Sequence, residues 1–134
     1  MMLYLPDTNV WIRELNNAPS IVQARFRATR QDEIALCDIV KAELYFGAFK
    51  SPRVAENLTA LATVFGAFAS LSFNNEAARV YGKLRADLFR RGTPIGPLDL
   101  QIASIALLNG CILVTNNTRE FSRIDGLQIE DWEG

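Results

Sequence analysis

The stretch IGPLDLQIASIALLNGCILVTNN, residues 95–117, decides the fold class. Pro97 stands near its start and Gly110 in its middle. Proline is favoured at the first position of a helix and glycine just past the end, so we expect a helix over 97–110. The apolar run CILVT at 111–115 then predicts a buried strand. A buried helix leading directly into a buried strand is typical of a parallel sheet covered by helices.

The same alternation extends along the chain. Asp38 is the expected N-cap of one helix, and Pro52 is expected to open the next. The alternation predicts an α/β fold, with a parallel sheet and helices on both faces. The expected strands are 2–6, 33–37, 70–73, 111–115 and 127–132, and the expected helices are 7–15, 18–30, 38–50, 52–69, 75–92 and 97–110.

Length and composition predict one globular domain, 1–134. Apolar residues make up 49% of the chain and charged residues 22%, and no apolar run reaches the roughly 18 residues that span a bilayer. The start, MMLYLPDTN, lacks a basic segment, so we expect no signal peptide and a cytoplasmic protein. Cys37 and Cys111 occupy apolar positions and are expected to be reduced core thiols.

Charge and histidine content narrow the function classes. The net charge is −1, so any contact with nucleic acid would need a local basic patch. The chain has no histidine. A Ser-His-Asp triad, a Cys-His pair, a histidine-liganded zinc site and a histidine general base are therefore excluded. Any enzymatic chemistry would use carboxylates, lysine, hydroxyls or a metal held by oxygen.

Three acids stand at positions where an acid is costly. Asp7 follows the first expected strand, and sites in open parallel sheets form beyond the carboxyl ends of the strands. Glu43 and Asp99 share helix faces with apolar residues such as Ile39 and Ile102. Simpler roles exist: a turn or cap for Asp7, a salt bridge for Glu43, and a favourable helix dipole for Asp99.

Considered together, these acids indicate a metal site. Two carboxylates about 4 Å apart repel by about 4 kcal/mol at an effective dielectric constant of 20, and a divalent cation removes that cost. Ligand sets of oxygen alone suit Mg²⁺ or Mn²⁺. Such ions commonly share their coordination shell with a phosphate, which indicates phosphoryl chemistry with a metal-activated water.

Four motifs carry a resemblance that covers nearly the whole chain: LPDTNVWI at 5–12, KAELYFGA at 41–48, IGPLDLQIAS at 95–104 and LVTNNTREFSRIDGLQIEDW at 113–132. In this order and spacing they resemble PIN-domain ribonucleases, specifically VapC-type toxins of bacterial toxin–antitoxin pairs. The resemblance implies a three-layer α/β/α sandwich with a central, mostly parallel sheet and an acidic pocket that binds Mg²⁺ or Mn²⁺.

The resemblance also implies the site residues. The catalytic acids of the family match Asp7, Glu43 and Asp99, which would hold the ion directly or through water. Many relatives carry a fourth acid where this chain has Asn117, so Glu120 is the nearby acid expected to serve, and one firmly held ion is expected. The residues expected to orient the attacking water or a phosphate oxygen are Thr115, Asn116, Asn117 and Asn9.

Substrate and partners follow from the same resemblance. Relatives with this signature cleave tRNA, several of them in the anticodon loop of initiator tRNA. They are held inactive by a small antitoxin (VapB-like) and are usually homodimers. The apolar stretches 44–49 and 58–69 are candidates for the antitoxin groove or a dimer interface, or they belong to the core.

Basic residues on the expected helix 75–92 form a candidate RNA surface. Arg79, Lys83 and Arg90 fall on one stripe, flanked by Arg85 and Arg91. Asp87 lies on the same stripe, so internal ion pairs on a solvated face are the alternative. Lys50 and Arg53 form a second candidate patch.

Two other function classes stay open at this point. The DTN at 7–9 loosely resembles the loop of haloacid-dehalogenase-like phosphatases, in which Asp7 would be a covalent nucleophile, although position 9 is Asn and the chain has no room for a cap domain. The second alternative is a catalytically inert PIN-like binding scaffold, in which Asn117 marks a decayed site. Retention of Asp7, Glu43 and Asp99 counts against it.

Overall fold

The computed structural model describes residues 2–16 and 18–133, so both ends of the expected 1–134 domain lie outside the described residues. Five short strands pair in parallel and confirm the five expected strands. They form one sheet in the order β1-β4-β5 and a second of β2 and β3, joined by a single bridge between Tyr4 and Ile34. The strands are β1 (Tyr4–Pro6), β2 (Ala35–Cys37), β3 (Ala69–Leu71), β4 (Ile112–Val114) and β5 (Gln128–Glu130).

Pro6 explains why the pairing between β1 and β2 is so short. The backbone of Leu3 and that of Asp7 bond to β4, through Ile112 N to Leu3 O and Asp7 N to Val114 O, both at 2.9 Å. Because strand residues alternate in direction, the backbone of Pro6 faces β2. Proline has no N–H to donate there, so the ladder to β2 stops at the Tyr4 bridge.

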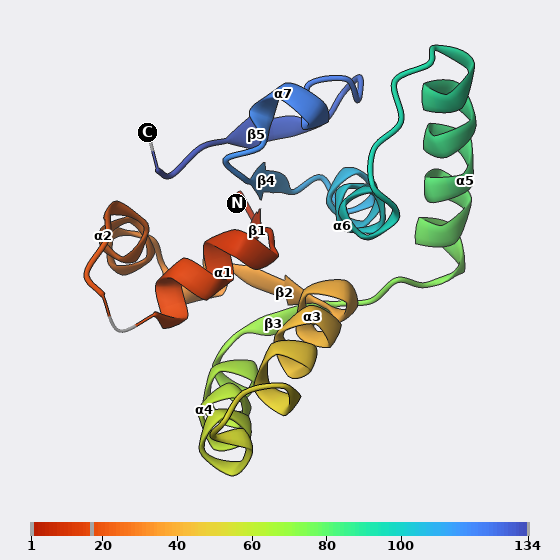
Figure 1. The fold of residues 1–134 in the computed structure, drawn as a ribbon. Coiled ribbons are helices and arrows are strands. Elements are labelled where there is room, and N and C mark those ends of the chain that lie inside the picture. The colour runs from red at the N-terminus through yellow and green to blue at the C-terminus, as the bar shows by residue number, and fades with distance from the viewer. Residues whose placement is uncertain (1, 17, 134) are drawn as a thin grey trace.

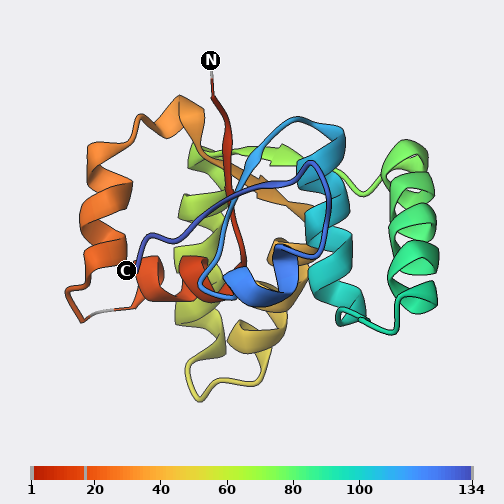
Figure 2. The ribbon, with the colours of Figure 1, turned by 90° about the horizontal axis from the view of Figure 1, so that it is seen from above.

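Helices cover both faces of the sheet, as the sequence predicts. Figures 1 and 2 show α2 on one side and α6 on the other, with α5 packed on α6 away from the strands. The six expected helices are present: α1 (Thr8–Leu15), α2 (Ile21–Ala28), α3 (Asp38–Phe49), α4 (Val54–Ala67), α5 (Asn75–Arg90) and α6 (Pro97–Leu108). Two short elements were not expected, the 3-10 helix η1 (Gln31–Glu33) and α7 (Thr118–Phe121).

Two predicted helix starts are wrong. The N-cap of α3 is Cys37, and Asp38 is the first helical residue. The Asp38 carboxylate instead accepts a hydrogen bond from the backbone N–H of Phe73 at 3.1 Å, which ties the start of α3 to the segment after β3. Helix α4 begins at Val54 after an Arg53 N-cap rather than at Pro52.

The core lies on both sides of the sheet. On one side Trp11 of α1 makes edge contacts with Phe26 and Phe68, each with ring centroids 5.0 Å apart. On the other, α6 is buried at nearly every position from Leu100 to Ala106. Cys37 and Cys111 are buried free thiols, as expected, and burial raises the pKa of each to about 11. Within the described ranges, no helix is long and apolar enough to cross a bilayer.

Candidate active site

Asp7 stands where β1 passes into α1 and has two roles. Its Oδ1 accepts the backbone N–H of Val10 at 3.0 Å, so the side chain caps α1. The side chain is buried, with 6% of the residue exposed. Burial raises the pKa of the Asp7 carboxyl, hydrogen bonds from the Thr115 hydroxyl and the Val10 amide lower it, and the charges of Glu133 and Glu43 raise it. The cap role considered for Asp7 is therefore present together with its place in an acidic cluster.

Glu43 lies on α3, half-buried and facing α1. Its Oε1 accepts a hydrogen bond from the Thr8 hydroxyl at 2.5 Å. The expected alternative for Glu43, a salt bridge, is not found among the described residues, where its side chain bonds to the neutral Thr8. A neutral donor orients a carboxylate without neutralising it, so the charge of Glu43 stays available.

Asp99 occupies the first turn of α6, after a Gly96 N-cap that makes no side-chain hydrogen bond. A helix dipole alone would lower the pKa of an acid there. The pKa of Asp99 is raised, first by burial and then by the negative charges of Asp7, Glu43 and Glu120. The three acids singled out in the sequence, and Glu120, therefore gather at the carboxyl edge of the sheet.

Glu120 is carried by α7, the short helix after β4. The Asn117 side-chain amide donates a hydrogen bond to Glu120 Oε2, and the Asn117 backbone N–H donates to the Thr115 hydroxyl at 3.0 Å. The Thr115 hydroxyl in turn donates to Asp7. Asn117 thus holds Glu120 beside the cluster, at the position where relatives were expected to carry the acid itself.

The structure separates the remaining expected polar residues into two groups. Thr115 is fully buried next to Asp7, and Asn117 is half-buried against Glu120. Asn9 and Asn116 are exposed. It is Thr8, one residue before Asn9, that contacts the acids.

The acid cluster has the chemistry of a divalent cation site. In the part of the chain described, no salt bridge involves Asp7, Glu43, Asp99 or Glu120. Over the same residues, no three acid, thiol or imidazole side chains lie close enough to ligate one ion together. An ion shared by these acids would therefore keep water in its shell, as Mg²⁺ usually does in proteins.

One acid near the cluster was missed by sequence reasoning. Glu133, after β5, adds to the negative charge that raises the pKa of Asp7. The Glu133 carboxylate also forms a salt bridge with Arg13, whose Nε lies 2.6 Å from Glu133 Oε1. No local pattern signals this arrangement, because it joins the end of the described chain to α1.

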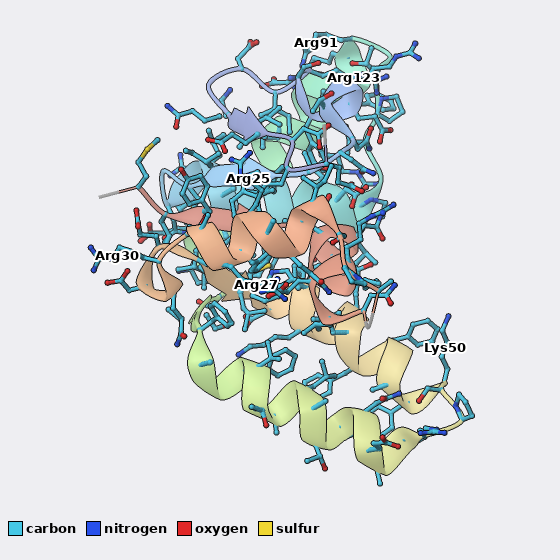
Figure 3. All side chains as sticks on the ribbon, turned by 90° about the vertical axis from the view of Figure 1, so that its left-hand side faces the viewer. Arg25, Arg27, Arg30, Lys50, Arg91 and Arg123 are labelled. Carbon is cyan, nitrogen blue, oxygen red and sulfur yellow. The ribbon has the colours of Figure 1, made fainter. Side chains whose placement is uncertain are left out.

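The expected RNA-binding residues fall in two separate regions. On α5, Lys83 and Arg90 both pair with Asp87 at 3.1 Å, which is the internal pairing considered from the sequence. Arg79 is exposed on the same helix. Lys50 follows α3, with its ammonium 4.9 Å from the centre of the Phe46 ring. Figure 3 shows Lys50 far from Arg91, the neighbour of Arg90.

An apolar groove runs beside Glu43. It encloses a cavity of about 350 Å³ between α1, α3 and α4, lined mainly by apolar or small residues. Leu44 and Gly47 come from the stretch 44–49, and Ala60 and Leu61 from 58–69, the two segments considered from the sequence for an antitoxin groove, a dimer interface or the core. Because Glu43 also lines this cavity, the groove opens onto the acid cluster.

Parallel strands in this order, with acids gathered at their carboxyl edge, define the class of the protein. The family model described as PIN domain matches residues 4–127, and the chain belongs to the PIN domain family. Within that family it is related to the VapC ribonucleases. It is 39% identical over 132 residues to "tRNA(fMet)-specific endonuclease VapC" of Shigella flexneri, which covers 98% of this chain and 99% of the relative.

Other relatives agree. "Ribonuclease VapC2" of Rickettsia felis is 35% identical over 133 residues, which are 98% of this chain and 99% of the relative. Among solved structures, the DNA-bound VapBC of Salmonella typhimurium superposes with a TM-score of 0.90 at 38% identity, covering 98% of this chain and 99% of the matched chain. The predicted family and fold class are both confirmed.

Proposed function

We propose that this chain is a metal-dependent endoribonuclease toxin, kept inactive by a cognate antitoxin. One observation carries the proposal: burial, and then the negative charges of Asp7, Glu43 and Glu120, raise the pKa of Asp99, so these four acids lie near one another. In the described residues none of them forms a salt bridge. Uncompensated, partly buried acids with only oxygen donors suit Mg²⁺ or Mn²⁺.

The residues divide the work of hydrolysis. Asp7, Glu43 and Asp99 would hold the cation, which supplies positive charge to a phosphodiester and lowers the pKa of water. Thr8 fixes Glu43, since its hydroxyl donates to Oε1 at 2.5 Å. Glu120 completes the acidic set. Its carboxylate is held by the side chain of Asn117.

Polar groups around the acids would position the reacting atoms. Thr115 is already engaged, donating to Asp7 and accepting from the backbone of Asn117. Its role is therefore to fix Asp7. The exposed amides of Asn116 and Asn9 are free to contact a phosphate oxygen or the attacking water.

The proposed substrate is tRNA, with the anticodon loop of initiator tRNA as the first target to examine. Support comes from the Shigella flexneri and Salmonella typhimurium relatives, both described as tRNA(fMet)-specific endonucleases, at 39% and 38% identity. Arg79, Lys83, Arg90 and Lys50 are proposed to contact its phosphates. A structured RNA with an exposed loop suits a protein of net charge −1 whose basic residues are local.

The proposed inhibitor is a VapB-like antitoxin segment lying in the apolar groove. Several similar structures are VapBC assemblies. Because Glu43 lines both the groove and the acid cluster, an apolar segment seated there could extend a basic side chain toward the acids. The same occupant would block RNA and hold the cluster neutral.

The chain is further proposed to act in the cytoplasm as a homodimer. Phe46 and Phe49 at the end of α3 are 64% and 62% exposed, more apolar surface than one helix of a monomer needs. Sedimentation velocity tests this directly. A purely monomeric species at micromolar concentration would contradict the dimer and leave the nuclease proposal intact.

The geometry counts against the phosphatase alternative. A covalent nucleophile needs an accessible carboxylate oxygen. Asp7 is 6% exposed, and its Oδ1 already accepts the Val10 N–H while the side chain also accepts from Thr115.

The decisive test is cleavage by protein freed of antitoxin. Total bacterial RNA and purified tRNA are incubated with Mg²⁺, with Mn²⁺ and with EDTA. We expect discrete, metal-dependent cuts that are lost in Asp99→Asn. Glu76→Gln is a matched control, because Glu76 is also an acid in a helix first turn but is exposed on α5.

Each outcome of this assay tests a different part of the proposal. No cutting by folded wild-type protein under either metal contradicts the nuclease and favours a binding scaffold. Cutting that persists in Asp99→Asn contradicts the assignment of the site. Cuts mapped to another RNA leave the nuclease in place and overturn the tRNA target.

A further inference from the structure

Phe89 has an unusual position on the surface. It lies one residue before the end of α5 and is 81% exposed, the most exposed large apolar side chain in residues 2–16 and 18–133. A phenylalanine on the solvent face of a helix gains nothing from the core. Its ring is available to another molecule.

Two hollows flank this ring. One, of about 410 Å³, is lined by Arg85, Phe89, Leu100 and the chain segment 94–97. The other, of about 520 Å³, is lined by Arg85, Phe89 and Arg90 with the small residues Gly82 and Ala86. Phe89 and Arg85 therefore form a wall shared by both, with space on either side for a flat group.

The first hollow and the acid cluster both include residues of the first turn of α6. Pro97 and Leu100, which line it, belong to the first turn of α6, and Asp99 lies between them in the same turn. The wall of the hollow and Asp99 are therefore carried by the same turn of one rigid helix, with the Asp99 side chain on a different face of that turn. A chain bound at the acids could place a neighbouring residue in the hollow.

The charge around Phe89 is positive. Arg85 donates to the Tyr81 hydroxyl at 3.1 Å and, in the described chain, forms no salt bridge. Arg91 and Arg123 lie together at this end of the molecule (Figure 3), and both donate to backbone carbonyls. A second copy of this chain would meet these arginines with its own in a two-fold contact, which disfavours self-association here.

We propose that Phe89 stacks on an unpaired base of the substrate RNA, with Arg85 contacting that base or its phosphate. The proposal rests on the ribonuclease function proposed above. Aromatic rings next to arginines bind single-stranded loops by stacking and charge. Because the hollow and Asp99 share the first turn of α6, the stacked base fixes which phosphodiester reaches the acids. Phe89 is thus a specificity-determining residue.

The test uses the RNA stem-loop that wild-type protein cleaves, together with versions carrying one abasic nucleotide at each loop position. Loss of a base–aromatic stack lowers binding by about 5- to 150-fold. We expect Phe89→Ala to lower kcat/KM on the intact loop by that factor and Phe89→Tyr to stay within about twofold. Arg85→Gln should reduce the slope of log affinity against log salt by about one. Ile21→Ala, which changes another exposed apolar residue on the distant α2, should cleave like wild type.

The abasic series separates stacking from a structural effect. At one loop position, removing the base should lower the kcat/KM of wild-type protein by the same factor as Phe89→Ala lowers it on the intact loop. Removing that base should lower the kcat/KM of Phe89→Ala almost no further. Equal abasic penalties in both proteins overturn the proposal, as does cleavage by Phe89→Ala within twofold of wild type. A change of oligomeric state in Phe89→Ala would show a protein interface instead.

Failure of this inference is distinguishable from failure of the proposed function. If folded wild-type protein cleaves no RNA with Mg²⁺ or Mn²⁺, both proposals fall. If wild type cleaves and every abasic position lowers the kcat/KM of Phe89→Ala as much as that of wild type, only the stacking role falls.

Discussion

Replacing Thr8 by valine removes one hydroxyl and keeps the shape of the side chain. That hydroxyl donates a hydrogen bond to Glu43 Oε1 at 2.5 Å and so orients this acid. In Thr8→Val, Glu43 keeps its charge and loses its orientation. The variant therefore tests whether the acids work as a fixed constellation or only as negative charge.

The magnitude follows from the nature of the bond. Hydrogen bonds to charged groups contribute about 1.5–3 kcal/mol, and each 1.36 kcal/mol is a factor of ten. Since Glu43 is half-buried, water replaces part of the bond, so the lower half of this range applies. We expect metal affinity or cleavage rate to fall about 10- to 100-fold, as found for residues that orient metal ligands. The free energy of unfolding should fall by about 1.5–2 kcal/mol.

The assay is single-turnover cleavage of a tRNA substrate across a Mn²⁺ titration. Thr59→Val is the matched control, because Thr59 is exposed and its hydroxyl, among the residues described, bonds only to the Ala55 carbonyl within α4. In a Glu43→Gln background, Thr8→Val should add less than about a threefold loss, because the two residues act together. A Thr8→Val protein whose rate and metal midpoint lie within twofold of wild type would refute the reasoning.

Three further predictions concern charge. Asp99→Asn should raise the melting temperature of the metal-free protein by a few degrees at pH 7, since it removes one of several repelling acids; a lower melting temperature would contradict this. The pKa values of Asp7 and Asp99 are raised in the folded state, so between their unfolded and folded values the folded protein binds more protons. Its stability in EDTA should therefore rise as pH falls from 7 toward the unfolded aspartate pKa of about 3.9, relative to the Asp7→Asn/Asp99→Asn variant, in denaturant titrations; parallel pH profiles would contradict this. Asp87→Asn releases Lys83 and Arg90, so RNA affinity should rise and its salt dependence steepen in filter binding; unchanged affinity would place these residues outside the RNA surface.

Local signals were sufficient for most of the fold. Helix α6 begins at Pro97, as its sequence predicts, and Gly110, with φ of 66°, follows its end. Helix α7 was missed because four residues are too short to show a periodic pattern. The Asp38 N-cap was wrong because extended Cys37 takes that position and Asp38 bonds to Phe73, 35 residues away.

For the candidate site, too, the sequence predicted the features with a local pattern and not those that depend on packing. Asp7, Glu43 and Asp99 were found because each acid sits among apolar neighbours or at a strand end, which is a local pattern. The bond from Thr8 to Glu43 joins residues 35 apart, and the contact of Glu133 with α1 spans the chain. Such contacts depend on how the helices and strands pack, so the sequence around each residue does not predict them.

The kind of donor around the acids explains why the site stays negative. Thr8, Thr115 and Asn117 hold Glu43, Asp7 and Glu120 through hydroxyl or amide groups, which orient carboxylates without adding charge. A lysine in any of these places would lower the pKa values of the acids and occupy the site permanently. With neutral donors, the carboxylates keep repelling one another in the folded protein, and only an incoming cation can remove that repulsion. That cation can be a metal ion or the basic side chain of an inhibitor, so the same repulsion drives both activation and inhibition.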